Sequence, residues 1–157
     1  MNLAFELNGK AASLEIEPRE TLAEVLRARC RLTGVKLSCE AQVCGSCTVL
    51  VDGLPVSACT YLAYEARGRR VTTIEGLADE SGRLHPLQQA FLDHFSFQCG
   101  FCTPGMILAA KALLDEKADV TDAEIIAYMD GNLCRCTGYL PIVKAIQQAS
   151  REMRGQK

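Results

Sequence analysis

The sequence has little of what nucleic-acid binding or membrane insertion requires. Tryptophan is absent, aromatic residues make up only 6% of the chain, and the formal net charge is −2. A protein that binds nucleic acids usually carries a basic face and aromatic side chains on which bases stack. No apolar run approaches the ~20 residues of a transmembrane helix. We therefore expect neither a nucleic-acid partner nor a membrane span.

The N-terminus also lacks the features of a secretory signal. Residues 1–6, MNLAFE, have neither a basic start nor a long apolar stretch. We therefore expect a cytoplasmic protein. Its 157 residues allow one or two small domains, and its 48% apolar and 23% charged residues are ordinary for a folded chain.

Cysteine is the residue type that stands out, with nine in the chain. Disulfides are disfavoured in a reducing compartment, and an odd number cannot pair completely. Apart from Cys30, the cysteines form two groups of four, and four is the ligand number of a structural zinc site or an iron–sulfur cluster. The sequence therefore predicts two metal centres. The first group is Cys39, Cys44, Cys47 and Cys59, and the second is Cys99, Cys102, Cys134 and Cys136.

The first group has the spacing of a plant-type [2Fe–2S] site. It reads C-x4-C-x2-C-x11-C, in which three thiolates converge from one loop and a remote cysteine completes the set. Gly45 lies inside this loop, where the backbone approaches the sulfur atoms. Zinc is the alternative, although zinc sites usually pair two short knuckles. No histidine occupies a ligand position, which excludes a Rieske centre.

The second group lies at two predicted helix starts. Cys99 and Cys102 precede Thr103-Pro104, and Cys134 and Cys136 precede the last helix. The free N–H groups of a helix N-terminus favour thiolates and anionic clusters. A zinc site would more often contain two C-x2-C knuckles than a C-x-C pair. An iron–sulfur cluster is the favoured interpretation, and zinc is the second.

The pattern of the whole chain predicts an α+β fold with two parts. The first part combines hairpins, one of which turns at Asn8-Gly9, with one helix, whose Thr21 and Glu24 form a capping box. Thr121 and Glu124 form a second capping box in the other part. The second part reads as a four-helix bundle, separated from the first by a polar linker. We expect strands at 2–7, 11–17, 48–51, 54–58 and 70–74, and a helix at 22–31. The remaining helices are expected to begin at Pro86, at Thr103, after Thr121 and at Pro141, the last ending near Met153.

Three stretches together resemble the iron–sulfur subunit of the molybdenum hydroxylases. They are CGSCTV at 44–49, QCGFCTPG at 98–105 and GNLCRCTGY at 131–139. This family includes xanthine dehydrogenase, aldehyde oxidoreductase and aerobic carbon monoxide dehydrogenase, and the resemblance covers nearly the whole chain. One loop departs from the family pattern, because Ser38 and Gln42 stand where the family often has glycine.

The resemblance implies both an architecture and partners. A plant-type ferredoxin-like, or β-grasp, domain is expected at 1–76, a linker at 77–84 and a helical [2Fe–2S]-binding domain at 85–157. The implied partners are a molybdopterin-binding large subunit and an FAD-binding medium subunit, assembled as a dimer of heterotrimers. The second cluster is expected next to the molybdopterin, with Gln98 and Cys136 beside the pterin, and the first cluster nearer to the flavin.

The predicted function is electron transfer within an oxidoreductase. The chain shows no nucleophile–base pair, so substrate conversion is assigned to another subunit. Electrons are expected to pass from the molybdopterin site through two [2Fe–2S] clusters to FAD or another acceptor. The alternatives are a free-standing two-cluster electron carrier and a zinc-bound structural module.

A few further residues have simple structural interpretations. Cys30 is expected to be a small buried side chain, and His85 to cap a helix or lie at the surface. Arg67, Arg69 and Arg70 read as a solvated turn. Arg135, between two cluster ligands, fits either charge compensation or simple exposure.

Overall fold

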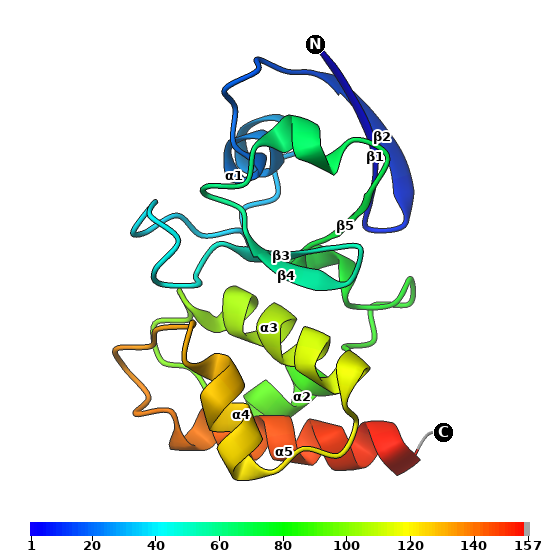
Figure 1. The fold of residues 1–157 in the computed structure, drawn as a ribbon. Helices are drawn as coiled ribbons and strands as arrows, with labels where there is room; N and C mark the ends of the chain where they lie inside the picture. The colour runs from blue at the N-terminus through cyan, green and yellow to red at the C-terminus, as the bar shows by residue number, and fades with distance from the viewer. Residues whose placement is uncertain (156–157) are drawn as a thin grey trace.

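The computed structural model describes residues 1–155 and shows a five-stranded sheet followed by four helices (Figure 1). It confirms the α+β class. The strands are β1 (Asn2–Leu7), β2 (Lys10–Glu15), β3 (Thr48–Val51), β4 (Leu54–Ser57) and β5 (Arg70–Thr72). The helices are α1 (Leu22–Glu24), α2 (Pro86–Asp93), α3 (Thr103–Glu116), α4 (Asp122–Met129) and α5 (Leu140–Gly155).

The sheet is mixed, with the strand order β2-β1-β5-β3-β4. Only β1 and β5 pair in parallel; the other neighbours are antiparallel. The predicted Asn8-Gly9 turn joins β1 to β2, and both residues have positive φ angles, 51° and 77°. β2 ends two residues and β4 one residue earlier than predicted. β5 also ends two residues early, because the chain after Thr72 enters a short 3-10 turn at Ile74–Gly76.

The first helix departs from its predicted form. Its capping box is present, since the backbone N–H of Glu24 donates to Thr21 Oγ1 and the N–H of Thr21 donates to the Glu24 carboxylate. After α1, however, the helix widens into a π-helical segment, Val25–Arg29. It ends two residues before the predicted residue 31, where Arg31 takes a positive φ of 59°.

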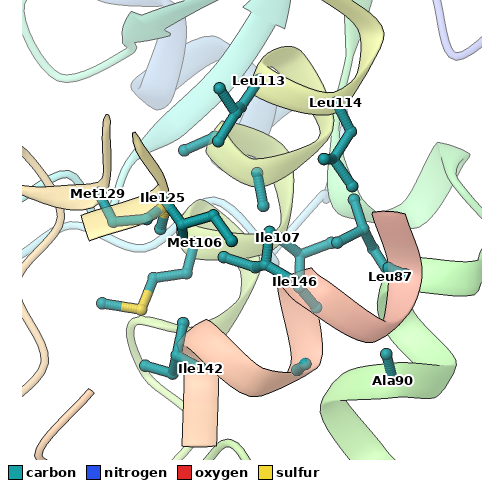
Figure 2. Close-up of a cluster of buried hydrophobic side chains, with 14 of the residues drawn as sticks. Leu87, Ala90, Met106, Ile107, Leu113, Leu114, Ile125, Met129, Ile142 and Ile146 are labelled. Carbon is teal, nitrogen blue, oxygen red and sulfur yellow. The ribbon is translucent and has the colours of Figure 1, made fainter. Parts of the chain in front are cut away.

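The four later helices enclose one apolar core (Figure 2). Met106 and Ile107 of α3 lie against Ile142 and Ile146 of α5, with Leu87 of α2 beside them. Each of these side chains is at least 95% buried, which gives the helical part its main hydrophobic stabilisation. Within residues 1–155, no helix combines the length with the apolar composition that a bilayer span requires.

Helix α3 also packs against the β3–β4 hairpin and so joins the two parts of the chain (Figure 1). Leu50 of β3 forms a small buried cluster with Leu108 and Ala112 of α3. The apolar face of α3 is therefore shared between the helical core and the sheet. This packing places the N-terminus of α3 next to the loop before β3. Cysteines of the second group precede that helix, and cysteines of the first group lie on that loop.

Candidate metal centres

The first cysteine group is assembled by one loop and one hairpin. Cys39 and Cys44 lie on the loop before β3, Cys47 immediately precedes β3, and Cys59 follows β4. The antiparallel pairing of Thr48 with Ser57 returns the chain to Cys47. The backbone N–H of Ala58 then donates to the Cys47 carbonyl at 3.3 Å. The hairpin thus brings Cys59 back towards Cys47, although 11 residues lie between them in the sequence.

Backbone amides of the loop surround the sulfur atom of Cys39. The N–H groups of Ala41, Val43 and Cys44 donate to it at 3.5, 3.4 and 3.4 Å. These hydrogen bonds, the one from Ala41 first, lower the pKa of Cys39 to about 6. The loop therefore favours the thiolate, the form that binds metal. Gln42 takes a positive φ of 59° in this loop, the conformation that glycine adopts most easily.

The other cysteines of the first group lie deeper. Cys47 and Cys59 are 3% and 9% exposed. Burial first, and then the neighbouring Cys59 thiol, raises the pKa of Cys47 to about 11. The Cys39 sulfur in turn has the Cys44 thiol as a hydrogen-bonding neighbour. The group therefore consists of an outer pair, Cys39 with Cys44, and an inner pair, Cys47 with Cys59.

The second cysteine group is formed by two loops at helix starts. Cys99 and Cys102 precede α3, and Cys134 and Cys136 lie between α4 and α5. The sulfur atoms of Cys99 and Cys136 are 3.6 Å apart, although 37 residues separate them. Both are exposed. Next to them, Gln98 Nε2 donates to the Cys136 carbonyl at 2.9 Å and links the two loops.

The second group also has an inner pair, Cys102 with Cys134. Burial first, and then the contacting Cys134 thiol, raises the pKa of Cys102 to about 12. For Cys134 burial acts in the same direction, but hydrogen bonds from the Thr137 side chain and backbone outweigh it and lower the pKa. The N–H of Cys134 donates to the Tyr139 hydroxyl at 2.9 Å, which orients its loop.

The donor chemistry of both groups fits [2Fe–2S] clusters. All nine cysteines are free thiols, and each group offers two contacting pairs, one for each iron of a dinuclear cluster. Residues 1–155 contain no set of three or more His, Cys, Asp or Glu side chains gathered as around a single metal ion. Next to Cys102, the Thr103 hydroxyl is buried without a hydrogen-bond partner in the described residues, so a donor remains available at the second group.

The remaining residues singled out in the sequence have structural surroundings. His85 Nδ1 accepts the Leu87 N–H at 3.2 Å, which confirms a capping role. Cys30 is half-buried against the sheet core, and burial raises its pKa. Arg69 forms an ion pair with Asp52 at 3.0 Å. Arg135 is exposed.

Two residues of the motif-like stretches have contacts that the sequence did not predict. Asn132 is a buried polar residue whose side chain donates to the Gly45 carbonyl of the first cysteine loop, and Gly105 of α3 lies directly against that same carbonyl. Their position within motif-like stretches, without being ligands, was the only available signal. The partner of each lies far away in the sequence, so spacing could not identify it.

Comparison with known families matches both parts of the chain. Residues 5–76 match the 2Fe-2S iron-sulfur cluster binding domain, and residues 73–147 match the [2Fe-2S] binding domain. The two matches together span most of the sequence. They support iron–sulfur rather than zinc as the metal chemistry of both parts.

Similar proteins are subunits of larger oxidoreductases. The chain is 48% identical to the nicotine 6-hydroxylase small subunit of Paenarthrobacter nicotinovorans, over 95% of this chain and 89% of that protein. It is also 48% identical to the nicotinate dehydrogenase small FeS subunit of Eubacterium barkeri, over 95% and 94% of the two chains.

The fold is also similar to that of a solved structure. It matches a chain of quinoline 2-oxidoreductase from Pseudomonas putida 86 with a TM-score of 0.94 and 43% identity, over 99% of this chain and 96% of that one. Together with the sequence matches, this confirms the predicted resemblance. The chain belongs to the molybdenum hydroxylase family as its small iron–sulfur subunit, an electron-transfer subunit with two [2Fe–2S]-binding domains.

Proposed function

We propose that the eight grouped cysteines are the cluster ligands. Cys39, Cys44, Cys47 and Cys59 hold the first [2Fe–2S] cluster, and Cys99, Cys102, Cys134 and Cys136 hold the second. The supporting observation is the pairing of thiols across loops that are distant in sequence, seen most directly in the 3.6 Å separation of the Cys99 and Cys136 sulfur atoms. Bound clusters of this type supply one-electron transfer.

In this proposal, each contacting pair binds one iron. The pairs are Cys39 with Cys44, Cys47 with Cys59, Cys99 with Cys136, and Cys102 with Cys134. The amides around Cys39 supply hydrogen bonds to a thiolate ligand, and the buried Cys47 and Cys59 exclude water from one side of the first site.

The same proposal assigns faces to the partner subunits. The exposed pair Cys99 and Cys136, with Gln98 beside it, faces the molybdopterin of a large subunit. The exposed Cys39 side of the first group faces the FAD of a medium subunit. In this proposal the holoenzyme is a cytoplasmic dimer of heterotrimers. The exposure of these cysteines supports the two faces, because a relay subunit needs an accessible site at each end.

We also propose the domain bounds 1–76 and 85–157, with a linker at 77–84. Two separate cores support this division, one centred on the sheet and one on the helices. Residues 156 and 157 of the second domain lie outside the described residues.

The ligand assignment is tested by single cysteine substitutions in the purified full chain. We expect about four iron and about four acid-labile sulfide per chain, from two [2Fe–2S] clusters. Cys59→Ser should lose the first cluster and keep the EPR signal of the second, and Cys102→Ser should do the reverse. Cys30→Ser is the matched control, because this thiol lies outside both groups, and it should retain both signals.

Two results would contradict the assignment. The first is full iron content with both EPR signals in Cys59→Ser and Cys102→Ser. The second is native protein that contains stoichiometric zinc and no iron, which would restore the zinc alternative.

A further inference from the structure

The two parts of the chain meet at a buried seam around Gly45. Gly45 lies between two ligands of the first cysteine group and takes a positive φ of 66°. A side chain at Gly45 would collide with the Asn132 amide, and one at Gly105 would collide with the Gly45 carbonyl. Segments from all three motif-like stretches therefore touch at one point, on the side of the molecule where their loops gather (Figure 1).

Asn132 is the polar centre of this seam. Its side chain is 7% exposed, which is unusual for an amide unless it is hydrogen-bonded. Asn132 Nδ2 donates to the Gly45 carbonyl at 3.1 Å and lies 3.4 Å from Thr48 Oγ1. The Thr48 hydroxyl donates to the same carbonyl at 2.7 Å. One side chain from the second cysteine loop is thus held by two residues of the first.

A backbone hydrogen bond continues the connection. The N–H of Leu133 donates to the Cys44 carbonyl at 2.9 Å. Cys44 belongs to the first ligand group, and Leu133 directly precedes Cys134 of the second. The adjacent Asn132 contacts hold the chain in the position from which this hydrogen bond forms. The two ligand loops are therefore fixed against each other and not only within their own domains.

We infer that Asn132 is a positioning residue that sets the separation and orientation of the two metal centres. The inference rests on the ligand assignment proposed above and concerns the relation between the centres, not their binding. Asn132 contacts no cysteine sulfur, so its loss leaves both ligand sets complete. Removing it leaves the Gly45 carbonyl with one donor fewer and the two loops held together by fewer hydrogen bonds, so we expect their mean separation to increase.

The test is the magnetic interaction between the two reduced clusters in the purified full chain. In the doubly reduced state, two nearby paramagnets split each other's EPR lines, and the dipolar part of this splitting falls with the inverse cube of their separation. We expect Asn132→Ala to retain wild-type iron and sulfide and both single-cluster signals, with a smaller splitting. Thr48→Val, which removes the neighbouring hydroxyl but keeps the shape, should reduce the splitting less.

Asn8→Gly is the matched control. Asn8 also forms two side-chain hydrogen bonds to a remote residue, Thr73, at 3.0 and 2.8 Å, but far from both cysteine groups. Glycine tolerates its positive φ, so the substitution removes the hydrogen bonds without backbone strain. This variant should keep the wild-type splitting.

Wild-type splitting in Asn132→Ala, or an equal decrease in Asn8→Gly, overturns the inference. If Asn132→Ala does not fold, Thr48→Val decides, and wild-type splitting in that variant overturns it. Iron analysis of the unmodified chain distinguishes failure of this inference from failure of the ligand assignment, since missing iron there contradicts the ligand assignment itself.

Discussion

At the scale of single residues, the Thr103 hydroxyl is a donor for which residues 1–155 provide no acceptor. It follows Cys102, a proposed ligand, at the first position of α3, so we expect a sulfur atom of the second centre to be its acceptor. Hydrogen bonds to cluster sulfurs favour the reduced, more negative state and raise the reduction potential. We therefore expect the hydroxyl to tune the potential of the second cluster without being a ligand.

Thr103→Val should lower the reduction potential of the second cluster and leave the first unchanged. Valine keeps the branched shape but cannot donate, whereas Thr103→Ser keeps the donor and should stay near wild type. An EPR-monitored redox titration follows both clusters in one sample, and the first serves as the internal reference. Equal potentials in the valine and serine variants would show that the hydroxyl has no such role.

Gly105 is a residue whose size matters more than its flexibility. In a helix, alanine normally stabilises by about 1 kcal/mol relative to glycine. Here the added methyl group would collide with the Gly45 carbonyl, a backbone atom that cannot move aside alone. We expect Gly105→Ala to destabilise by about 1–3 kcal/mol, the usual cost of overpacking. Gly131→Ala, which meets nothing within 4 Å, is the control.

The melting temperature of the cluster-loaded chain measures this effect. A lower melting temperature in Gly105→Ala with little change in Gly131→Ala is the expected result. Equal melting temperatures in both variants would mean that the contact between Gly105 and Gly45 accommodates a methyl group, which would contradict the prediction.

At the scale of elements, local signals in the sequence were sufficient to predict turns and helix caps. The Asn8-Gly9 turn and the capping boxes at Thr21 and Thr121 are set by neighbouring residues, and all three are present. The π-helical segment Val25–Arg29 was not predicted. The seam at Gly45 was missed as well, because its partners lie on segments about 60 and 87 residues further along the chain. The two cysteine groups could be proposed from the sequence because each contains closely spaced cysteines, whereas the contact between the groups leaves no such local pattern.

The capping box of α4 offers a test at this scale. The N–H of Glu124 donates to Thr121 Oγ1, and the Lys117 ammonium first, then the Thr121 N–H, lowers the pKa of Glu124 to about 2. The Glu124 carboxylate of the capping box is therefore ionised at neutral pH. Thr121→Ala should lower the free energy of unfolding by about 1 kcal/mol, the usual loss for an N-cap.

Chemical denaturation at pH 7, followed by circular dichroism, measures this loss. Thr33→Ala is the control, because Thr33 is exposed and caps no helix. A loss in Thr121→Ala no larger than in Thr33→Ala would contradict the contribution of the cap.

At the scale of the whole molecule, the proposed relay has one exposed cysteine site in each of the two cysteine groups. The exposed pair Cys99 and Cys136 lies at one end, and the exposed Cys39 at the other. Between them, the Leu133–Cys44 hydrogen bond joins the two ligand loops. In the proposed relay, an electron enters at the second centre and leaves at the first, and this hydrogen bond connects the two. Gln98 donates to the carbonyl of Cys136, so this side chain positions a proposed ligand at the proposed entry face.

Gln98→Ala tests this direction in the assembled enzyme. The substitution keeps all eight cysteines but removes the amide that links the two loops and that we place beside the pterin. A lost hydrogen bond costs about 1 kcal/mol, so we expect substrate-driven reduction of the second cluster to slow about fivefold or the molybdenum cofactor to be retained less well. Chemical reduction of both clusters should stay normal.

Arg69→Ala, which breaks an ion pair with Asp52 in the sheet domain, should leave substrate-driven reduction of the second cluster unchanged. Rapid-freeze EPR after substrate addition resolves the two clusters, and the proposed order fails if Arg69→Ala slows the first step while Gln98→Ala does not.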